Sequence, residues 1–110
     1  MLTFVESPTF TEQITSLLSD AEYAEFQRAL ATNPAAGDVI PGLGGLRKVR
    51  MAAKGKGKRG GARVIYLLMI EPGIVYLFYV YTKGEMADLK PDQKKRLRQA
   101  VEEIKAQFKK

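Results

Sequence analysis

The apolar positions of this chain follow two different periods, and these periods predict helices and strands. A short run with the character of a β-strand occupies residues 2–6. Apolar residues then recur at spacings of 4, 3 and 1, which predicts an amphipathic helix with Ser7 at its N-cap and Pro8 in its first turn. The apolar positions of this helix are Phe10, Ile14, Leu17 and Leu18.

A second helix is predicted directly after the first, so the two should form a hairpin with a very short connection. It is expected to start at Ser19 or Asp20 and to end at the pair Asn33-Pro34. Its apolar stripe consists of Tyr23, Phe26 and Leu30.

The next thirteen residues, 33–45, contain six Gly or Pro and are predicted to be a loop, with Val39 and Ile40 directed into the core. Three strand candidates follow, at residues 46–52, 62–70 and 74–82. The last two flank a turn signal at residues 71–73 and read as an antiparallel hairpin.

The last predicted helix opens at Pro91. Its apolar stripe consists of Leu97, Val101, Ile104 and Phe108. The order of elements is therefore β-α-α-β-β-β-α, which predicts one α+β domain over residues 1–110 with a small, mostly antiparallel sheet.

Composition narrows the classes of chemistry open to this chain. It contains no cysteine and no histidine, which excludes disulfides, thiolate nucleophiles, the commonest metal ligands and the usual general base near neutral pH. We therefore expect no metal and no other cofactor. The N-terminus lacks the features of a signal peptide and no apolar run is long enough to span a bilayer, so a cytoplasmic protein without membrane contact is expected.

The net charge of +6 is distributed very unevenly. Residues 1–46 hold one basic residue against six acidic ones, whereas residues 47–110 hold seventeen basic residues against six acidic ones. Clustered positive charge of this kind is the electrostatic signature of a polyanion-binding surface, and RNA is the expected partner.

Eight cations and no acid lie between Arg47 and Arg63. If residues 46–52 form a strand, Lys48 and Arg50 share one face, and Arg63 at the start of the next strand could join them. The glycines of the segment would allow a close approach to a phosphate backbone. The alternative interpretation of its Lys/Gly part is an exposed hairpin tip. The eight cations are Arg47, Lys48, Arg50, Lys54, Lys56, Lys58, Arg59 and Arg63.

RNA cleavage does not require histidine or cysteine, because RNA supplies its own nucleophile, the 2′-hydroxyl. A protein can align that hydroxyl and stabilise the charge that develops on the phosphorus with Lys and Arg. A lysine among many cations has a lowered pKa and could act as base or acid, with Glu85 as a possible partner carboxylate. A module that only binds RNA would need the same cations.

Two sequence blocks, GDVIPGLGGLRKVRMAAKGKGKRGGARVIYL and YVYTKGEMADL, resemble the RelE/HigB superfamily of toxins from bacterial toxin–antitoxin pairs, and the HigB-like branch most closely. The resemblance extends over nearly the whole chain. It implies a two-helix hairpin packed on a curved antiparallel sheet. It also implies a ribosome-dependent endoribonuclease that cleaves mRNA in the decoding site, inhibits translation, and leaves a 2′,3′-cyclic phosphate and a 5′-hydroxyl.

The resemblance also implies partners. These are a HigA-like helix-turn-helix antitoxin encoded beside the toxin, the ribosome and mRNA, and operator DNA only through the antitoxin.

Carried over by position, the catalytic residues implied by the resemblance are Lys48, Arg50, Arg63 and Lys83. Tyr81 is placed to stack on a base or to serve as a core tyrosine. Lys54, Lys56, Lys58 and Arg59 lie in an insertion that RelE lacks and are expected, with Arg47, to contact RNA.

The chain departs from the family pattern at one point that matters for the chemistry. RelE-type enzymes place a tyrosine in the last helix, where this chain has only Phe108, so the general base stays open, with lysine preferred. Two alternatives also stay open. One is a non-catalytic toxin of the same fold that inhibits DNA gyrase, as ParE toxins do, and the other is a plain RNA-binding module.

Overall fold

A computed structural model of the chain describes residues 2–53, 61–82 and 89–108. It contains, in chain order, β1 (Thr3–Glu6), α1 (Pro8–Leu17), α2 (Asp20–Thr32), β2 (Asp38–Val39), β3 (Arg47–Ala53), β4 (Gly61–Met69), β5 (Ile74–Thr82) and α4 (Pro91–Gln107). The predicted α+β class and the predicted order of elements are confirmed, with the two-residue strand β2 as an addition inside the predicted loop.

The helical hairpin begins where the capping residues predict. The Ser7 hydroxyl accepts a hydrogen bond from the Phe10 N–H at 3.0 Å and donates one to the Phe78 carbonyl at 2.7 Å, which ties the start of α1 to β5. Ser19 and Glu22 form a reciprocal capping box at the start of α2. Both helix starts are therefore fixed by local side-chain chemistry that the sequence displays.

The five strands form one mixed sheet in the order β1-β5-β4-β3-β2. β1 pairs with β5 in parallel, and the chain between these two strands forms α1, α2, β2, β3 and β4. The pairs β4–β5, β3–β4 and β2–β3 are antiparallel. The sheet is thus mostly antiparallel, as predicted, with one parallel edge strand.

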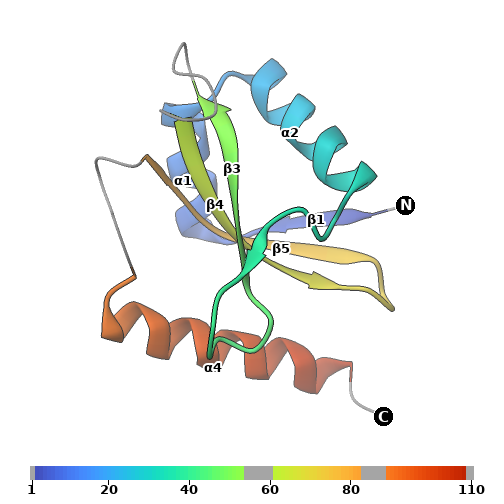
Figure 1. The fold of residues 1–110 in the computed structure, drawn as a ribbon, viewed down its shortest axis with the longest axis vertical. Coiled ribbons are helices and arrows are strands. Elements are labelled where there is room, and N and C mark those ends of the chain that lie inside the picture. The colour runs from blue at the N-terminus through green and yellow to red at the C-terminus, as the bar shows by residue number, and fades with distance from the viewer. Residues whose placement is uncertain (1, 54–60, 83–88, 109–110) are drawn as a thin grey trace.

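The α1–α2 hairpin lies on one side of the sheet and α4 on the other (Figure 1). A hydrophobic cluster lies on each of the two faces. On one face, α1 and α2 pack through Phe10, Ile14 and Phe26 against β-strand residues that include the fully buried Tyr66. On the other face, α4 packs against alternate residues of the same strands. The buried residues of this second cluster are Leu43, Leu46, Ile65, Leu67, Tyr81, Leu97 and Val101.

Two expectations about apolar residues were wrong. Val39 is 54 % exposed and does not enter the core, because β2 lies at the edge of the sheet and leaves this side chain uncovered. Phe108 follows the last residue of α4 as its C-cap and is 40 % exposed, so it does not continue the buried stripe of that helix. Ile40, in contrast, packs against the second cluster, as expected.

Within the described ranges, the structure contains no helix with the length and apolar character that crossing a bilayer requires.

Candidate nucleic-acid interface

Three adjacent strands bring Arg50, Arg63 and Tyr81 into one row across the sheet. Arg50 of β3 lies opposite Arg63 of β4, and Arg63 lies opposite Tyr81 of β5. Residues directly opposite in antiparallel strands have Cα atoms about 4.5–5.5 Å apart and side chains on the same face. The register therefore makes Arg50 and Arg63 direct neighbours, which the sequence suggested only as a possibility.

Lys48 extends this row along β3. It lies two positions before Arg50, so it shares the face of Arg50, while the intervening Val49 packs with the α1–α2 cluster on the opposite face. Lys48 pairs with Ile65, whose side chain belongs to the cluster under α4. Lys48, Arg50 and Arg63 thus lie on the α4 side of the sheet, and we call them the cationic row.

Arg63 is the least solvated member of the cationic row. Its backbone lies between Ala62 and Val64, which are both fully buried, and its own side chain is half-buried. Its Nη1 atom is buried and has no hydrogen-bond partner among the described residues. A buried donor on a charged group is costly when unsatisfied, and an anion could accept a hydrogen bond from this enclosed atom only if the residues around it moved.

Arg47 lies apart from the cationic row. Arg47 directly precedes Lys48 in β3, so its side chain lies on the opposite face of the sheet. Its guanidinium Nη1 donates to the carbonyl oxygens of Gly37 at 2.7 Å and Ala35 at 3.3 Å. The structure therefore uses Arg47 to hold the loop that follows α2.

The same loop is held a second time by Tyr66. Its hydroxyl donates to the Pro34 carbonyl at 2.8 Å and accepts from the Gly37 N–H at 3.0 Å. Burial raises the pKa of Tyr66 above its usual value, while the Gly37 hydrogen bond and the charge of Arg47 oppose this rise. A Cβ atom at Gly37 would lie 2.9 Å from the Lys48 carbonyl oxygen, so only glycine fits here beside the strand that carries the row.

The sequence that forms this sheet and its cationic row matches a known family. The family model of the RelE toxin of the RelE/RelB toxin–antitoxin system matches residues 11–110, which is nearly the whole chain. The chain belongs to the RelE toxin family. It is therefore the toxin of a toxin–antitoxin pair, its partner is an antitoxin, and toxins of this family are generally ribonucleases.

Tyr81 of this RelE-family toxin is largely enclosed. Its side chain is 3 % exposed and packs in the cluster with Leu97 and Val101 of α4. Of the two roles considered for Tyr81, this burial favours the core role, because a base could stack on the ring only if the residues around it moved.

Several predicted site residues lie outside the described residues of the toxin. These are Lys54, Lys56, Lys58, Arg59 and Lys83, together with the possible partner carboxylate Glu85. Their assignments remain predictions. In the part of the chain that the structure describes, no cluster of three or more acidic side chains is arranged to hold a metal ion.

One surface feature of the toxin was not predicted from the sequence, a cleft between α2 and β3. Its acidic border comes from Glu22 and Glu25, which are three residues apart on one face of α2 and precede the apolar Phe26. The excess of acidic residues in the first 46 positions was a signal that could have directed attention to α2.

Proposed function

We propose that this RelE-family toxin, as a member of the HigB-like branch, is a ribosome-dependent endoribonuclease that cleaves mRNA in the decoding site. The observation that carries the proposal is the placement of Arg63 beside Arg50, with a buried Nη1 that lacks a partner among the described residues. Two adjacent guanidinium groups match the geometry of a phosphate, since each offers donors in a planar fork.

In the proposed reaction the mRNA provides the nucleophile. The 2′-oxygen bonds to the adjacent phosphorus and gives its proton to a base, for which we favour lysine. The bond from phosphorus to the 5′-oxygen breaks, and that oxygen takes up a proton. The products are a 2′,3′-cyclic phosphate and a 5′-hydroxyl, and the reaction needs no cofactor.

Each cation has a distinct proposed role in this reaction. Arg63 and Arg50 hold the scissile phosphate and stabilise the negative charge that develops on its oxygens. Lys48, on the same face of β3, and Lys83 are the candidates for proton transfer. Lys54, Lys56, Lys58 and Arg59 would contact ribosomal RNA.

The ribosome has a defined part in this proposal. The cationic row binds phosphate groups, which every RNA has, so alignment of one 2′-hydroxyl must come from elsewhere. A decoding site that holds mRNA in a fixed conformation would supply that alignment. The proposal therefore includes a cytoplasmic location and a helix-turn-helix antitoxin of the HigA type, which would connect the toxin to operator DNA.

Primer extension on mRNA in a translating extract tests the proposal. We expect new 5′ ends inside the coding frame with wild-type toxin and none with Arg63→Ala, because loss of a phosphate-binding guanidinium lowers the rate by about a hundredfold or more. Arg28→Ala is the matched control, since Arg28 is an exposed arginine on α2, outside the row. Naked RNA of the same sequence should be cut far more slowly.

Circular dichroism of each variant shows whether it is folded. An unfolded Arg63→Ala protein would make Arg63 structural and would contradict its assignment. Absence of cleavage with translation unaffected would instead favour a gyrase inhibitor or a plain RNA-binding module.

A further inference from the structure

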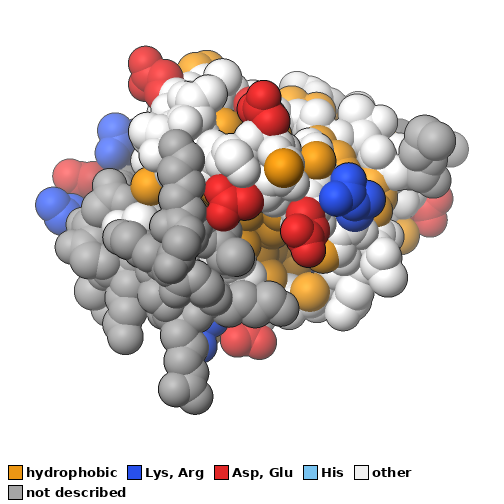
Figure 2. All heavy atoms as spheres, turned by 90° about the horizontal axis from the view of Figure 1, so that it is seen from above, with side chains coloured by type: hydrophobic (Ala, Val, Ile, Leu, Met, Phe, Trp, Pro, Cys, Tyr) orange, Lys and Arg blue, Asp and Glu red, His pale blue; other side chains and the backbone are white. Residues whose placement is uncertain are grey.

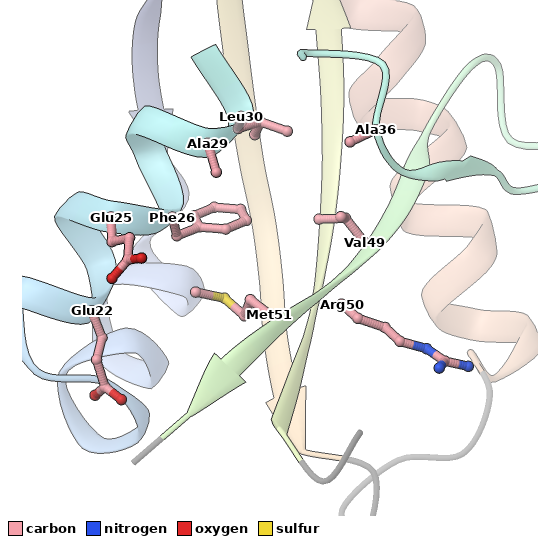
Figure 3. A pocket seen from close by; sticks show the side chains of 9 residues that line it. All are labelled: Glu22, Glu25, Phe26, Ala29, Leu30, Ala36, Val49, Arg50 and Met51. Atoms are coloured by element: carbon pink, nitrogen blue, oxygen red, sulfur yellow. The ribbon is translucent and has the colours of Figure 1, made fainter. Parts of the chain in front are cut away.

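The cleft between α2 and β3 is a hollow whose floor is apolar. It has a volume of about 280 Å³, and Phe26, Leu30, Val49 and Met51 are among the residues that line it (Figure 3). Ala29 lies on its α2 wall with an exposed side chain. A larger side chain at that position would enter the cleft, so its depth depends on the small size of Ala29.

The border of this α2–β3 cleft is acidic. Glu22 and Glu25 stand on the α2 side, and Figure 2 shows several acidic side chains and one basic side chain around an apolar hollow on this surface. Negative charge at the border repels a polyanion, so RNA and DNA are unsuitable occupants. The complementary occupant has an apolar side chain for the floor and a basic side chain for the border.

Among the described residues, the backbone beside the cleft also has no paired strand on one edge. β2 pairs with β3 only at Arg47 and Lys48, and the described residues provide no second strand on this edge from Val49 onward. An unpaired strand edge presents N–H and C=O groups that an extended peptide can pair with. The cleft and the edge together suit an extended protein segment.

We propose that the α2–β3 cleft is a docking site for the antitoxin. An extended antitoxin segment would place an apolar side chain between Phe26 and Met51 and a Lys or Arg beside Glu22 and Glu25. This inference rests on the family's antitoxin partner and does not depend on the proposed nuclease reaction.

The α2–β3 cleft and the cationic row lie on opposite faces of β3. Arg50 lines the cleft, yet its side chain points away from Phe26 and Met51, toward the opposite face of the sheet (Figure 3). A segment bound in the cleft therefore contacts β3 from the side opposite to the cationic row. It would hold the antitoxin on the toxin without itself covering Arg50.

Titration calorimetry with the purified cognate antitoxin tests the proposal. Ala29→Phe fills the cleft, and the pair Glu22→Gln/Glu25→Lys changes the charge of its border. Glutamine at position 22 retains an acceptor for the capping box, so α2 keeps its start. We expect each variant to weaken antitoxin binding by about tenfold or more.

The control is Glu12→Lys, which changes an exposed acid on α1 outside the cleft and should bind as wild type does. Wild-type affinity in folded cleft variants would overturn the proposal. Unchanged antitoxin binding with loss of toxin self-association would also overturn it, because the cleft would then be an interface between two copies. Cleavage assays on the free variants separate this result from the nuclease proposal, since the cleft variants should cleave mRNA at the wild-type rate.

Discussion

At the scale of single residues, Arg63 is expected to lower the stability of the isolated toxin and is proposed to bind phosphate. Its guanidinium is half-buried next to fully buried β4 neighbours, and its enclosed Nη1 has no hydrogen-bond partner in the described part of the chain. Partial burial of an incompletely paired cation opposes folding. A phosphate bound to the exposed part of the guanidinium would offset part of this destabilisation, and it would reach Nη1 only if the neighbouring residues moved.

The partial burial of the Arg63 charge predicts opposite effects of one substitution on stability and on activity. Arg63→Met keeps the length of the side chain and removes the charge, so it should raise the free energy of unfolding by about 1 kcal/mol and abolish mRNA cleavage. Urea denaturation measures the first effect and primer extension the second.

Arg50→Met is the matched control for the stability effect. Arg50 is exposed, so its replacement should change the free energy of unfolding by less than about 0.5 kcal/mol. A less stable Arg63→Met protein would show that the guanidinium stabilises the fold, which would contradict a destabilising effect of its burial.

At the scale of elements, the carboxylate of Glu6 joins the first strand to both helices of the hairpin. Its Oε1 accepts from the Thr11 hydroxyl of α1 at 2.7 Å, and its Oε2 accepts from the Tyr23 hydroxyl of α2 at 2.7 Å. Burial raises the pKa of Tyr23 above its usual value of 10.0, and the hydrogen bond and the negative charge of Glu6 raise it further. The network therefore needs Tyr23 in its protonated form.

The raised pKa of Tyr23 predicts a loss of stability at alkaline pH. Above about pH 10 the unfolded chain releases the phenolic proton while the folded chain retains it, so the free energy of unfolding falls as pH rises. Below that pH the contribution is fully present. Tyr23→Phe should lower stability at pH 8 by about 1 kcal/mol and flatten the decline between pH 9 and 11.

Urea denaturation across this pH range measures the effect of Tyr23→Phe. The flattening should be partial, because burial also raises the pKa of Tyr66. An identical alkaline slope in wild type and Tyr23→Phe would contradict the role given to Tyr23.

Also at this scale, the elements with local signals were predictable and those with long-range causes were not. The caps at Ser7 and Ser19 act within four residues, so the sequence displays them. β2 has only two residues and exists because β3 lies beside it, a contact that no local pattern encodes. The burial of Arg63 and Tyr81 depends in the same way on strand register, so the sequence suggested the cationic row without its degree of burial.

At the scale of the whole molecule, the two faces of β3 have different electrostatic surroundings. The cationic row lies on the α4 side, and the acidic border of the α2–β3 cleft lies on the α2 side. The uneven charge of the sequence thus gives the toxin a basic surface on the α4 side of β3 and an acidic surface on the α2 side.

This arrangement predicts that ribosome binding depends strongly on salt and that the cationic row carries part of the dependence. Raising monovalent salt from about 50 to 200 mM should weaken binding roughly a hundredfold, because each phosphate contact releases counterions. Lys48→Ala/Arg50→Ala should reduce the slope of log affinity against log salt by about one for each cation.

Binding of labelled toxin to purified ribosomes, followed by fluorescence anisotropy over this salt range, measures the slope. Arg28→Ala should leave the slope unchanged, since Arg28 lies on α2 and outside the row. Equal slopes for wild type and Lys48→Ala/Arg50→Ala would show that these two cations do not contact phosphate.

The parallel pairing of β1 with β5 has a consequence for the order in which the chain folds during its own synthesis. Ser7, at the end of β1, bonds to Phe78 of β5, 71 positions later in the chain. At roughly 5–20 residues per second, Ser7 is made about 4–14 s before Phe78, and the helical hairpin is also complete before β5 is made. β5 also adjoins Arg63 through Tyr81. The nascent toxin can therefore pair β1 and enclose Arg63 only after β5 has been made. A chain interrupted before β5 lacks both the strand that pairs with β1 and the strand beside Arg63.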